Sequence, residues 1–382
     1  MNIRNCVNCG EYKYIKENGL CRACLQERDM SGKIEIGSNS VSKNEIDSNY
    51  FYGGTSIIGM TGTGKTELAK YLLKQFYEKE YSIYYFNRVN KDVFKDKSGS
   101  KTYEIYHDKD QLNIMKVYRN KSDANYNEEI SKIRNIVINI IHELSQTISP
   151  IDERLLNIYL DSILRLKKEQ TIKDLYKYLT DDSMLNKLIR NSTVISGKKA
   201  KIIKNNRISR DVINCIKDII ENSTLNSIFS RNKNQNVNIN RDIIQENPVN
   251  INIEGIGSVK IIKLISFAIS EKIFSEIKLR DIKNQIICFD DINSPNISKL
   301  FSQSRAHKTG VIETRNQLNK NKNNRFDSLS ARNIISFKLH NYSSKYVGKR
   351  LNLTHKELKN LKIHHFKALF SNNLQINGKI NI

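Results

Sequence analysis

The stretch that decides the fold of this chain is residues 59–68, GMTGTGKTEL, which fits the pattern G-x-x-x-x-G-K-[ST]. Before it, the apolar residues TSIIG predict a short strand, and after it KTELAKYLLKQFYEKE has apolar residues at helical spacing. A glycine-rich loop between a strand and a helix binds phosphate groups, because its amides point inward and the helix N-terminus is positive. We therefore expect an α/β domain that binds a nucleoside triphosphate.

The predicted phosphate loop consists of eight residues: Gly59, Met60, Thr61, Gly62, Thr63, Gly64, Lys65 and Thr66. Its glycines permit backbone angles that other residues reach only at a cost in free energy. Lys65 is expected to contact the β- and γ-phosphates, and the Thr66 hydroxyl is expected to ligate Mg²⁺. The expected cofactors of this site are therefore ATP and Mg²⁺.

A triphosphate site needs a second anchor for its metal ion, usually a carboxylate at the end of a neighbouring strand. The stretch IICFDD supplies one, since four apolar residues precede Asp290 and Asp291. Asp290 is the candidate Mg²⁺ ligand, and Asp291 stands where an acid can polarise the attacking water. The alternative is that the acidic pair only ends a strand and begins a turn. The long gap between Lys65 and Asp290 argues against a small nucleotide kinase or a GTPase.

Further candidate residues lie in LFSQSRAHKTGVIETRNQ, where TGVIETR predicts the next strand. A polar residue at the tip of this strand can sense the γ-phosphate, and Asn316 and Gln317 are the candidates. Arg305 could contact a phosphate in a neighbouring subunit, as an arginine finger does, or be an ordinary surface arginine. Glu313, within the strand, is either an exposed edge residue or a substitute catalytic acid.

The rest of the chain predicts further strands around an all-helical stretch. Strands are expected at YSIYYFNR, KTYEIYH, PVNINI, NIISFKLH, HFKALF and LQINGKINI. Segments such as EEISKIRNIVINIIHEL have apolar residues three and four positions apart, SVKIIKLISFAISEKIFSEI predicts a buried helix, and Thr354–Glu357 predicts a capping box. The expected fold class is α/β with a largely parallel sheet. The expected parts are a four-cysteine module at 1–30, a polar linker at 31–50, a first part of the core at 51–125, a helical insertion at 126–235 and a second part of the core at 236–382.

Four of the six cysteines form the pattern C-x₂-C-x₁₁-C-x₂-C near the N-terminus: Cys6, Cys9, Cys21 and Cys24. The two-residue spacing lets each pair turn its sulfurs onto one ion, and four thiolates complete a closed tetrahedral Zn²⁺ site. A module of this length needs such a metal ion to fold. We expect structural zinc, which serves DNA contact, docking onto a partner, or stability alone.

The net charge of +23 over 382 residues favours polyanionic partners, because lysine and arginine release counterions from nucleic acid. The codon bias of an AT-rich genome is the alternative explanation for so many lysines. Residues 187–210 carry eight basic side chains and no acidic one, as a DNA-tracking surface or a solvated loop would. The sequence contains neither a run of eighteen apolar residues nor an apolar N-terminal signal. We expect a cytoplasmic protein without a membrane span, located in the host cytoplasm or associated with the virion if it is viral.

Taken in order, six features resemble the HerA/FtsK superfamily of P-loop ATPases: IIGMTGTGKT, YSIYYFNR, the helical insertion, IICFDD, SRAHKTGVIETRNQ and KRLNLTHKELKNLKIHHFKALF. The resemblance covers residues 51–372, and its specific parts are the arginine-containing segment before the sensor strand and the helix-then-strand tail. It implies a RecA-like core and a hexameric ring of identical subunits, with ATP between subunits and DNA threaded through the ring.

The resemblance also implies roles for single residues. By position, Lys65 and Thr66 match the family's nucleotide-binding pair, Asp290 its metal-binding acid and Asp291 its catalytic acid. Many members have glutamate at the last position, whereas viral packaging ATPases often have two aspartates. Asn316, rather than Gln317, falls where the family has its sensor glutamine, which is a departure from the family pattern.

Three functions are compatible with these features. The first is an ATP-driven translocase of double-stranded DNA that packages a viral genome, favoured by the compact size and the two aspartates. The second is a HerA-type helicase or conjugation ATPase of a cell or plasmid. The third is a zinc-bearing nucleic-acid-binding protein that uses ATP only as an assembly switch. The expected partners are double-stranded DNA, further copies of this chain, and a capsid or DNA-terminus-recognition protein.

Overall fold

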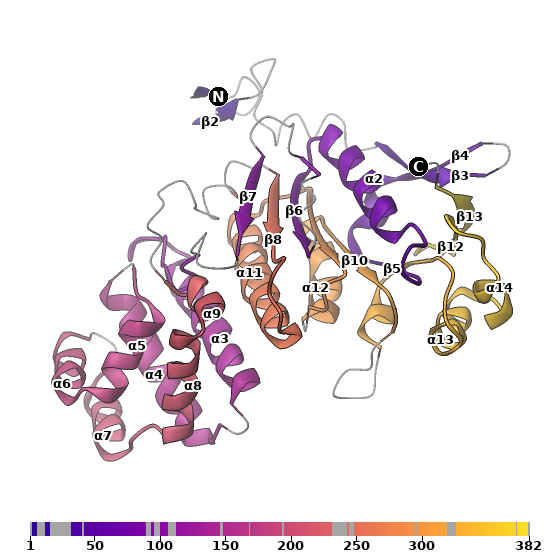
Figure 1. Ribbon diagram of the computed structural model, residues 1–382. Helices are drawn as coiled ribbons and strands as arrows, with labels where there is room; N and C mark the ends of the chain where they lie inside the picture. The colour runs from indigo at the N-terminus through magenta and orange to yellow at the C-terminus, as the bar shows by residue number, and fades with distance from the viewer. Residues whose placement is uncertain are drawn as a thin grey trace. The chain divides into compact units, whose positions relative to one another are not determined.

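The computed structural model describes residues 2–5, 12–15, 32–39, 42–88, 93–94, 100–105, 112–145, 148–167, 169–192, 195–230, 243, 248–294, 296–318, 326–371 and 373–380. The chain divides into two compact units. One unit, the sheet unit, comprises Met1–Thr102, Arg241–Asn252 and Asp281–Ile382. The other, the helical unit, comprises Tyr103–Asn240 and Ile253–Arg280. Both are drawn in Figure 1.

Among the described residues, the sheet has eleven strands, and the division between the units falls within the last of them. The spatial order is β4 (Lys43–Asp47), β3 (Lys33–Ser38), β13 (Gln375–Lys379), β12 (His365–Leu369), β11 (Asn333–Ser336), β5 (Gly53–Ile58), β10 (Thr309–Arg315), β9 (Gln285–Asp290), β6 (Ser82–Asn87), β8 (Val249–Asn252) and β7 (Lys101–Glu104). The strands from β11 to β8 pair in parallel, and those from β4 to β11 pair antiparallel. The largely parallel sheet predicted from the sequence is therefore confirmed.

The parallel register brings the predicted site residues to one edge. Thr314 of β10 lies opposite Asp290 of β9, and Arg315 lies opposite Ile58 of β5. Because parallel strands end at the same edge of the sheet, the loops that follow β5, β9 and β10 meet there. The phosphate loop follows β5, which lies next to β10 in Figure 1; β9 lies on the other side of β10.

Helices cover both faces of the strand that leads into the loop. Helix α2 (Lys65–Glu78) packs its buried Leu68 and Leu72 into the same core as Ile57. Gly54, on the opposite face, leaves room for α12 (Ile297–Ser304), since a Cβ there would lie 2.4 Å from the Phe301 ring. The β-branched and apolar residues of β5 are buried throughout, as a strand covered on both faces requires.

The antiparallel side of the sheet corrects the expectation of a polar linker at 31–50. Strands β3 and β4 pair antiparallel there, and Ile34, Ile36 and Ile46 are buried in the core. The alternation of buried and exposed positions in KIEIGS is that of a half-buried strand. A 3-10 turn (η2, Ser48–Phe51) then connects β4 to β5.

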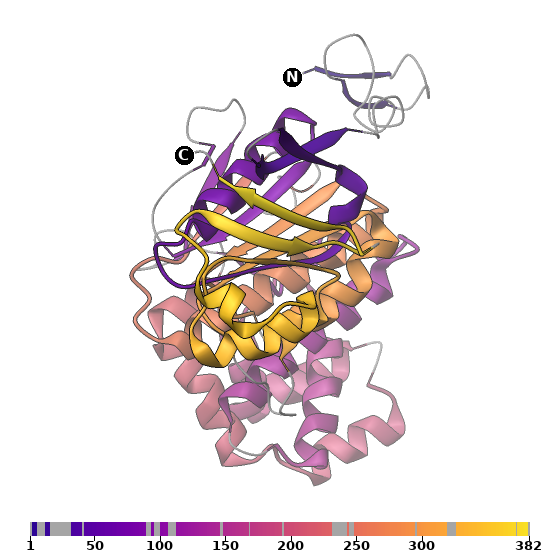
Figure 2. The same ribbon diagram turned by 90° about the vertical axis from the view of Figure 1, so that its right-hand side faces the viewer.

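The C-terminal strands β12 and β13 face the viewer in gold and yellow in Figure 2, next to two short helices. These helices are α13 (Asn341–Leu351) and α14 (His355–Lys359). The capping box predicted at the start of the second helix is confirmed, because Thr354 and Glu357 each accept a backbone hydrogen bond from the other.

The described helices of the helical unit are α3 (Tyr126–Leu144), α4 (Pro150–Leu166), α5 (Ile172–Thr180), α6 (Asp182–Asn191), α7 (Gly197–Asn205), α8 (Arg210–Glu221), α9 (Ser223–Ser227) and α11 (Val259–Arg280). The predicted helical insertion is thus helical, but it is larger than the expected 126–235. Helix α11, which we expected in the core domain, belongs to this unit. Its Lys272 and Glu276 form buried ion pairs with Glu129 and Arg119 of the same unit.

The four-cysteine module falls largely outside the described residues. Two short strands, β1 (Asn2–Asn5) and β2 (Tyr12–Ile15), pair antiparallel there, whereas Cys6, Cys9, Cys21 and Cys24 are not among the residues that the structure describes. Zinc at this position therefore stays a prediction. Elsewhere in the described chain, no cluster of three or more His, Cys, Asp or Glu side chains is placed to hold a metal ion. Of the described helices, none is long and apolar enough to span a membrane.

Candidate nucleotide-binding site

The phosphate loop has the backbone shape that its glycines allow. Gly62 and Gly64 have φ values of 76° and 106°, in the left-handed region that favours glycine. Gly59 is needed for a different reason, since a Cβ there would lie 2.6 Å from Cβ of Phe337. Helix α2 begins directly after Gly64, so its free amides and its positive end face the inside of the loop.

Two backbone hydrogen bonds fasten this loop to the C-terminal part of the sheet unit. The amide of Met60 donates to the carbonyl of Lys338 at 2.8 Å, just beyond the end of β11. The amide of His364, just before β12, donates to the carbonyl of Thr63 at 3.2 Å. The loop is therefore held from outside at two points, and its geometry does not depend on the glycines alone.

Lys65 is buried within the loop, with 6% of its surface exposed. Its Nζ donates to the carbonyl of Met60 at 2.8 Å. Burial lowers the pKa of Lys65, while the nearby Asp291 and Asp290 work in the opposite direction. A phosphate group in the loop would give this partly desolvated ammonium a charged partner in place of a carbonyl.

Three hydroxyl groups hold Asp290. Thr66 Oγ1 and Thr314 Oγ1 donate to its Oδ1 at 3.0 Å and 2.7 Å, and the hydroxyl of Tyr85 donates to its Oδ2 at 2.8 Å. Burial, followed by the charge of Asp290, raises the pKa of Tyr85, so this phenol stays a donor. A carboxylate and a threonine hydroxyl side by side are the hard oxygen donors that Mg²⁺ prefers, so Thr66 and Asp290 fit such an ion.

Asp291 lies at the surface of the same pocket in a special backbone conformation. Its φ is 54°, and its amide donates to Thr314 Oγ1 at 2.8 Å. Asn316 Nδ2 donates to its Oδ1 at 2.8 Å. Partial burial of the carboxylate raises the pKa of Asp291, whereas Arg88, Lys65 and the hydrogen bond from Asn316 lower it, and the net shift is upward. A more basic carboxylate is better suited to accept a proton from water.

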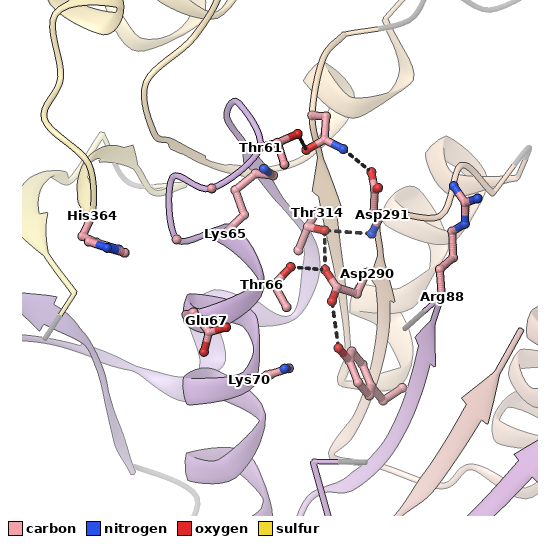
Figure 3. A pocket seen from close by; sticks show the side chains of 14 residues that line it. Thr61, Lys65, Thr66, Glu67, Lys70, Arg88, Asp290, Asp291, Thr314 and His364 are labelled. Carbon is pink, nitrogen blue, oxygen red and sulfur yellow. Dashed lines mark hydrogen bonds between the residues drawn. The ribbon is translucent and has the colours of Figure 1, made fainter. Parts of the chain in front are cut away.

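These groups line one pocket, which Figure 3 shows from close by. The phosphate loop and the start of α2 form one wall, and Asp290, Asp291 and Arg88 lie on the opposite side. His364 approaches the loop from the C-terminal segment, on the side away from the two aspartates. The pocket therefore brings together the loop and both acids that the sequence singled out.

The structure separates the two sensor candidates. Asn316 lines the pocket and links Thr61 to Asp291, since its Oδ1 accepts from Thr61 Oγ1 at 3.4 Å. Gln317 is exposed and is not one of the described residues that line this pocket. On geometry, Asn316 is the better candidate.

Arg305 lies at the other end of the sheet from the pocket. It is exposed in a 3-10 turn (η3, Arg305–His307) that precedes β10, whereas Asn316 follows β10. A strand of seven residues spans about 23 Å, too far for an arginine side chain to reach the pocket of its own chain. An arginine-finger role would therefore require the pocket of another subunit.

Glu313 fits neither of the two expectations for it. Its side chain is fully buried, accepts from Ser56 Oγ at 3.0 Å and forms an ion pair with Arg315 at 2.6 Å. Because residues two apart in a strand share a face, Glu313 and Arg315 pair beneath the pocket edge. Glu313 is therefore a structural acid, and neither an exposed edge residue nor a substitute catalytic acid.

Six pocket residues were missed by the sequence reasoning: Glu67, Lys70, Tyr85, Arg88, Thr314 and His364. Thr314 stands directly before the expected sensor position, and Tyr85 and Arg88 belong to the predicted strand YSIYYFNR and its end. The rule that ligands bind at the carboxyl ends of parallel strands could have found Arg88 and Thr314. His364 depends on the return of a distant segment, for which the sequence offers no local signal.

No family model and no curated protein matches this chain. Among solved structures, it is similar to VirB4 of Thermoanaerobacter pseudethanolicus, with 14% identity and a TM-score of 0.64 over 93% of this chain and 97% of that one. It is also similar to the plasmid coupling protein TrwB in complex with ADP and Mg²⁺, with 10% identity and a TM-score of 0.65 over 95% and 93% of the two chains. The genome packaging NTPase B204 from Sulfolobus turreted icosahedral virus 2 reaches a TM-score of 0.38, a likeness too weak to carry a conclusion. The chain thus has the RecA-like P-loop ATPase fold of VirB4 and TrwB, as the sequence predicted.

Proposed function

We propose that this chain hydrolyses ATP and uses the energy to move DNA. The observation that supports hydrolysis most directly is the shared pocket of the phosphate loop, Asp290 and Asp291. A binding-only site needs the loop and a metal-binding acid, whereas a second acid with a raised pKa beside them serves the chemical step.

In this proposal, the loop amides and Lys65 bind the β- and γ-phosphates. Thr66 and Asp290 hold Mg²⁺, which neutralises charge on the phosphate oxygens when it is bound. Tyr85 and Thr314 fix the Asp290 carboxylate through the hydrogen bonds described above, so that the metal-binding oxygens are oriented before ATP enters.

Asp291 orients the attacking water and accepts its proton. Asn316 connects this acid to Thr61 of the phosphate loop, so the loss of the γ-phosphate can be relayed to the segment that follows β10. Arg305 is proposed as an arginine finger that completes the nucleotide pocket of a neighbouring subunit in a ring. The resemblance to the HerA/FtsK superfamily implies that this ring is a hexamer.

DNA is the proposed cargo because of the net charge of +23 and the fold shared with TrwB, a bacterial conjugative coupling protein. Packaging of a viral genome into a capsid is favoured by the two adjacent aspartates and the compact chain. DNA transfer in conjugation is favoured by the likeness to TrwB over 95% of this chain. A capsid gene next to this gene would support genome packaging, and a relaxase gene in that position would support conjugative DNA transfer.

The test is a displacement assay in which a fluorescent third strand is bound to long duplex DNA. The intact chain should displace the third strand only when ATP is present, and Lys65→Ala should not displace it. ATP hydrolysis without displacement would contradict movement while leaving the ATPase in place. ATP binding without hydrolysis would favour the alternative of a non-motor assembly switch with a zinc module.

A further inference from the structure

The outward face of α13 carries a pattern that the nucleotide pocket does not use. Tyr342, Lys345, Tyr346, Lys349 and Arg350 follow one another at the spacing of a single helical face. We call these five residues the α13 face. It alternates aromatic and basic side chains, and no acidic residue occurs within the helix.

The opposite face of α13 is buried and tightly packed. Ser343, Ser344, Val347 and Leu351 are buried, and a Cβ at Gly348 would lie 2.8 Å from the carbonyl of Leu353. This close approach fixes the helix to the turn that follows it. The α13 face is therefore displayed on a rigid element, which lowers the entropy lost when a ligand binds.

The aromatic part of the face is a cluster of three rings. Phe326 and Tyr346 have ring centroids 4.6 Å apart, and Tyr342 and Tyr346 have theirs 5.2 Å apart. Even within this cluster, 51% of Tyr342 is exposed, and Tyr346 and Phe326 are partly exposed. Large exposed rings cost free energy in water, and their clustering at one place marks a contact surface.

The sequence around α13 is strongly basic. Residues 338–367 contain eight lysines and arginines and one acidic residue. That acid, Glu357, is occupied by its reciprocal hydrogen bonds with Thr354 at the start of α14. The face itself carries three of these basic side chains, Lys345, Lys349 and Arg350, which complement a polyanion.

We propose that the α13 face binds an unpaired nucleic-acid strand. Bases stack on Tyr342 and Tyr346, and the phosphates between them pair with Lys345, Lys349 and Arg350. Exposed rings favour an unpaired strand over a duplex, because the faces of paired bases are covered by their neighbours. Basic side chains between the rings favour a nucleic acid over an apolar partner.

The same helix is connected to the nucleotide pocket by two short routes. The carbonyl of Lys338, three residues before α13, accepts the amide of Met60 in the phosphate loop at 2.8 Å. Ser343 Oγ accepts the amide of Leu318 at 3.1 Å, two residues after Asn316. Binding of a nucleic-acid strand to the α13 face can therefore be coupled to ATP turnover. This coupling, unlike the binding itself, rests on the function proposed above.

The binding is tested without nucleotide, by fluorescence anisotropy of a labelled oligo(dT) against the full chain. The double variant Tyr342→Ala with Tyr346→Ala should bind oligo(dT) about ten-fold more weakly or worse. The double variant Tyr342→Phe with Tyr346→Phe keeps both rings and should retain the affinity. Lys345→Gln with Lys349→Gln should reduce the slope of log affinity against log salt by about 1.4. The matched control is the exposed pair Lys173 and Lys177 of α5, replaced by Gln, together with Tyr176→Ala.

A second measurement is independent of other basic surfaces. An oligonucleotide containing 5-iododeoxyuridine should cross-link under light to a peptide that contains Tyr342 or Tyr346. Equal affinity of the Ala variant and its α5 control for oligo(dT) would overturn the proposal. A loss of duplex binding in the Ala variant as large as its loss of oligo(dT) binding would also overturn it, as would equal binding of the intact chain to poly-glutamate. Circular dichroism and ATP-analogue binding, both expected at wild-type level, identify a variant that has merely unfolded. If the intact chain binds oligo(dT) but does not hydrolyse ATP, the proposed function is refuted while the proposed binding by the α13 face stands.

Discussion

Thr314 is the residue that connects the two acids of the pocket. Its hydroxyl donates to the Asp290 carboxylate and accepts from the amide of Asp291, so one side chain holds the carboxylate of Asp290 and the backbone of Asp291. Because Thr314 is buried, water cannot replace either hydrogen bond when the hydroxyl is removed.

We expect Thr314→Val to lower the free energy of unfolding by about 1–3 kcal/mol, because the amide of Asp291 loses its acceptor. ATP hydrolysis should fall by about ten-fold or more, since Asp290 and Asp291 lose their common support. Thr314→Ser, which keeps the hydroxyl, should restore most of both losses. The measurements are urea unfolding and steady-state hydrolysis; equal behaviour of the Val and Ser variants would show that the hydroxyl is not needed.

Arg88 provides a test of Asp291 through pH. A base must be ionised to act, so hydrolysis should fall as the pH drops through the raised pKa of Asp291. Arg88 lowers this pKa, so Arg88→Gln should move the acidic limb of the pH–rate profile to higher pH. Arg154→Gln, at an exposed arginine of the helical unit, should leave the limb in place. An unchanged limb in Arg88→Gln would mean that another group titrates.

At the residue scale, the sequence predicted those residues whose local pattern carries the signal. Asp290 and Asp291 end an apolar run, and the phosphate loop has a fixed spacing, so both could be placed without a structure. Tyr85 and Thr314 lie on two other strands and reach Asp290 only through the order of the sheet. Hydrogen bonds of this kind depend on which strands are neighbours, and that information is not local.

At the scale of elements, a buried ion network joins α3, α11 and the segment before α3 within the helical unit. Lys272 contacts Glu129 and Glu276 at 3.4 Å and 3.7 Å, and Arg119 contacts Glu276 at 3.3 Å. Burial alone would raise the pKa of Glu276, but the adjacent Lys272 and Arg119 lower it below its usual value. The stability that Glu276 contributes is therefore lost as the pH falls through this lowered pKa.

We expect Lys272→Met to lower the free energy of unfolding by about 3–5 kcal/mol, because it leaves buried carboxylates with too little positive charge. The control is Lys217→Met, since Lys217 forms a pair of the same spacing with Glu221 on an exposed surface. Such a surface pair contributes only about 0.5 kcal/mol, so the control should remain close to wild type. Similar losses in both variants in thermal or urea unfolding would contradict the role given to the buried network.

Elements with strong periodicity were predictable, and those that depend on tertiary pairing were not. The helix after the phosphate loop and the strands β9 and β10 follow directly from spacing and apolar runs. The antiparallel pair of β3 and β4 was missed because Ser, Asn and charged residues dominate 31–50. Its alternating Ile34 and Ile36 were the available signal, but such a short strand is stabilised mainly by packing against the rest of the sheet.

At the scale of the whole molecule, the pocket for ATP belongs to a strongly basic chain with the fold of VirB4 and TrwB. The fold class could be predicted because the phosphate loop specifies a strand, a loop and a helix in order. The division into units could be predicted only in part, since α11 is apolar on most faces and its sequence does not reveal which unit covers it.

The central claim, that the pocket hydrolyses ATP in response to DNA, is tested by steady-state ATP hydrolysis with and without long duplex DNA. The intact chain and Asp291→Asn are compared at the same protein and nucleotide concentrations. We predict that DNA stimulates hydrolysis by the intact chain and that this turnover disappears in Asp291→Asn, with ATP binding retained. No turnover by the intact chain despite tight ATP binding, or equal turnover by both proteins, would contradict the account.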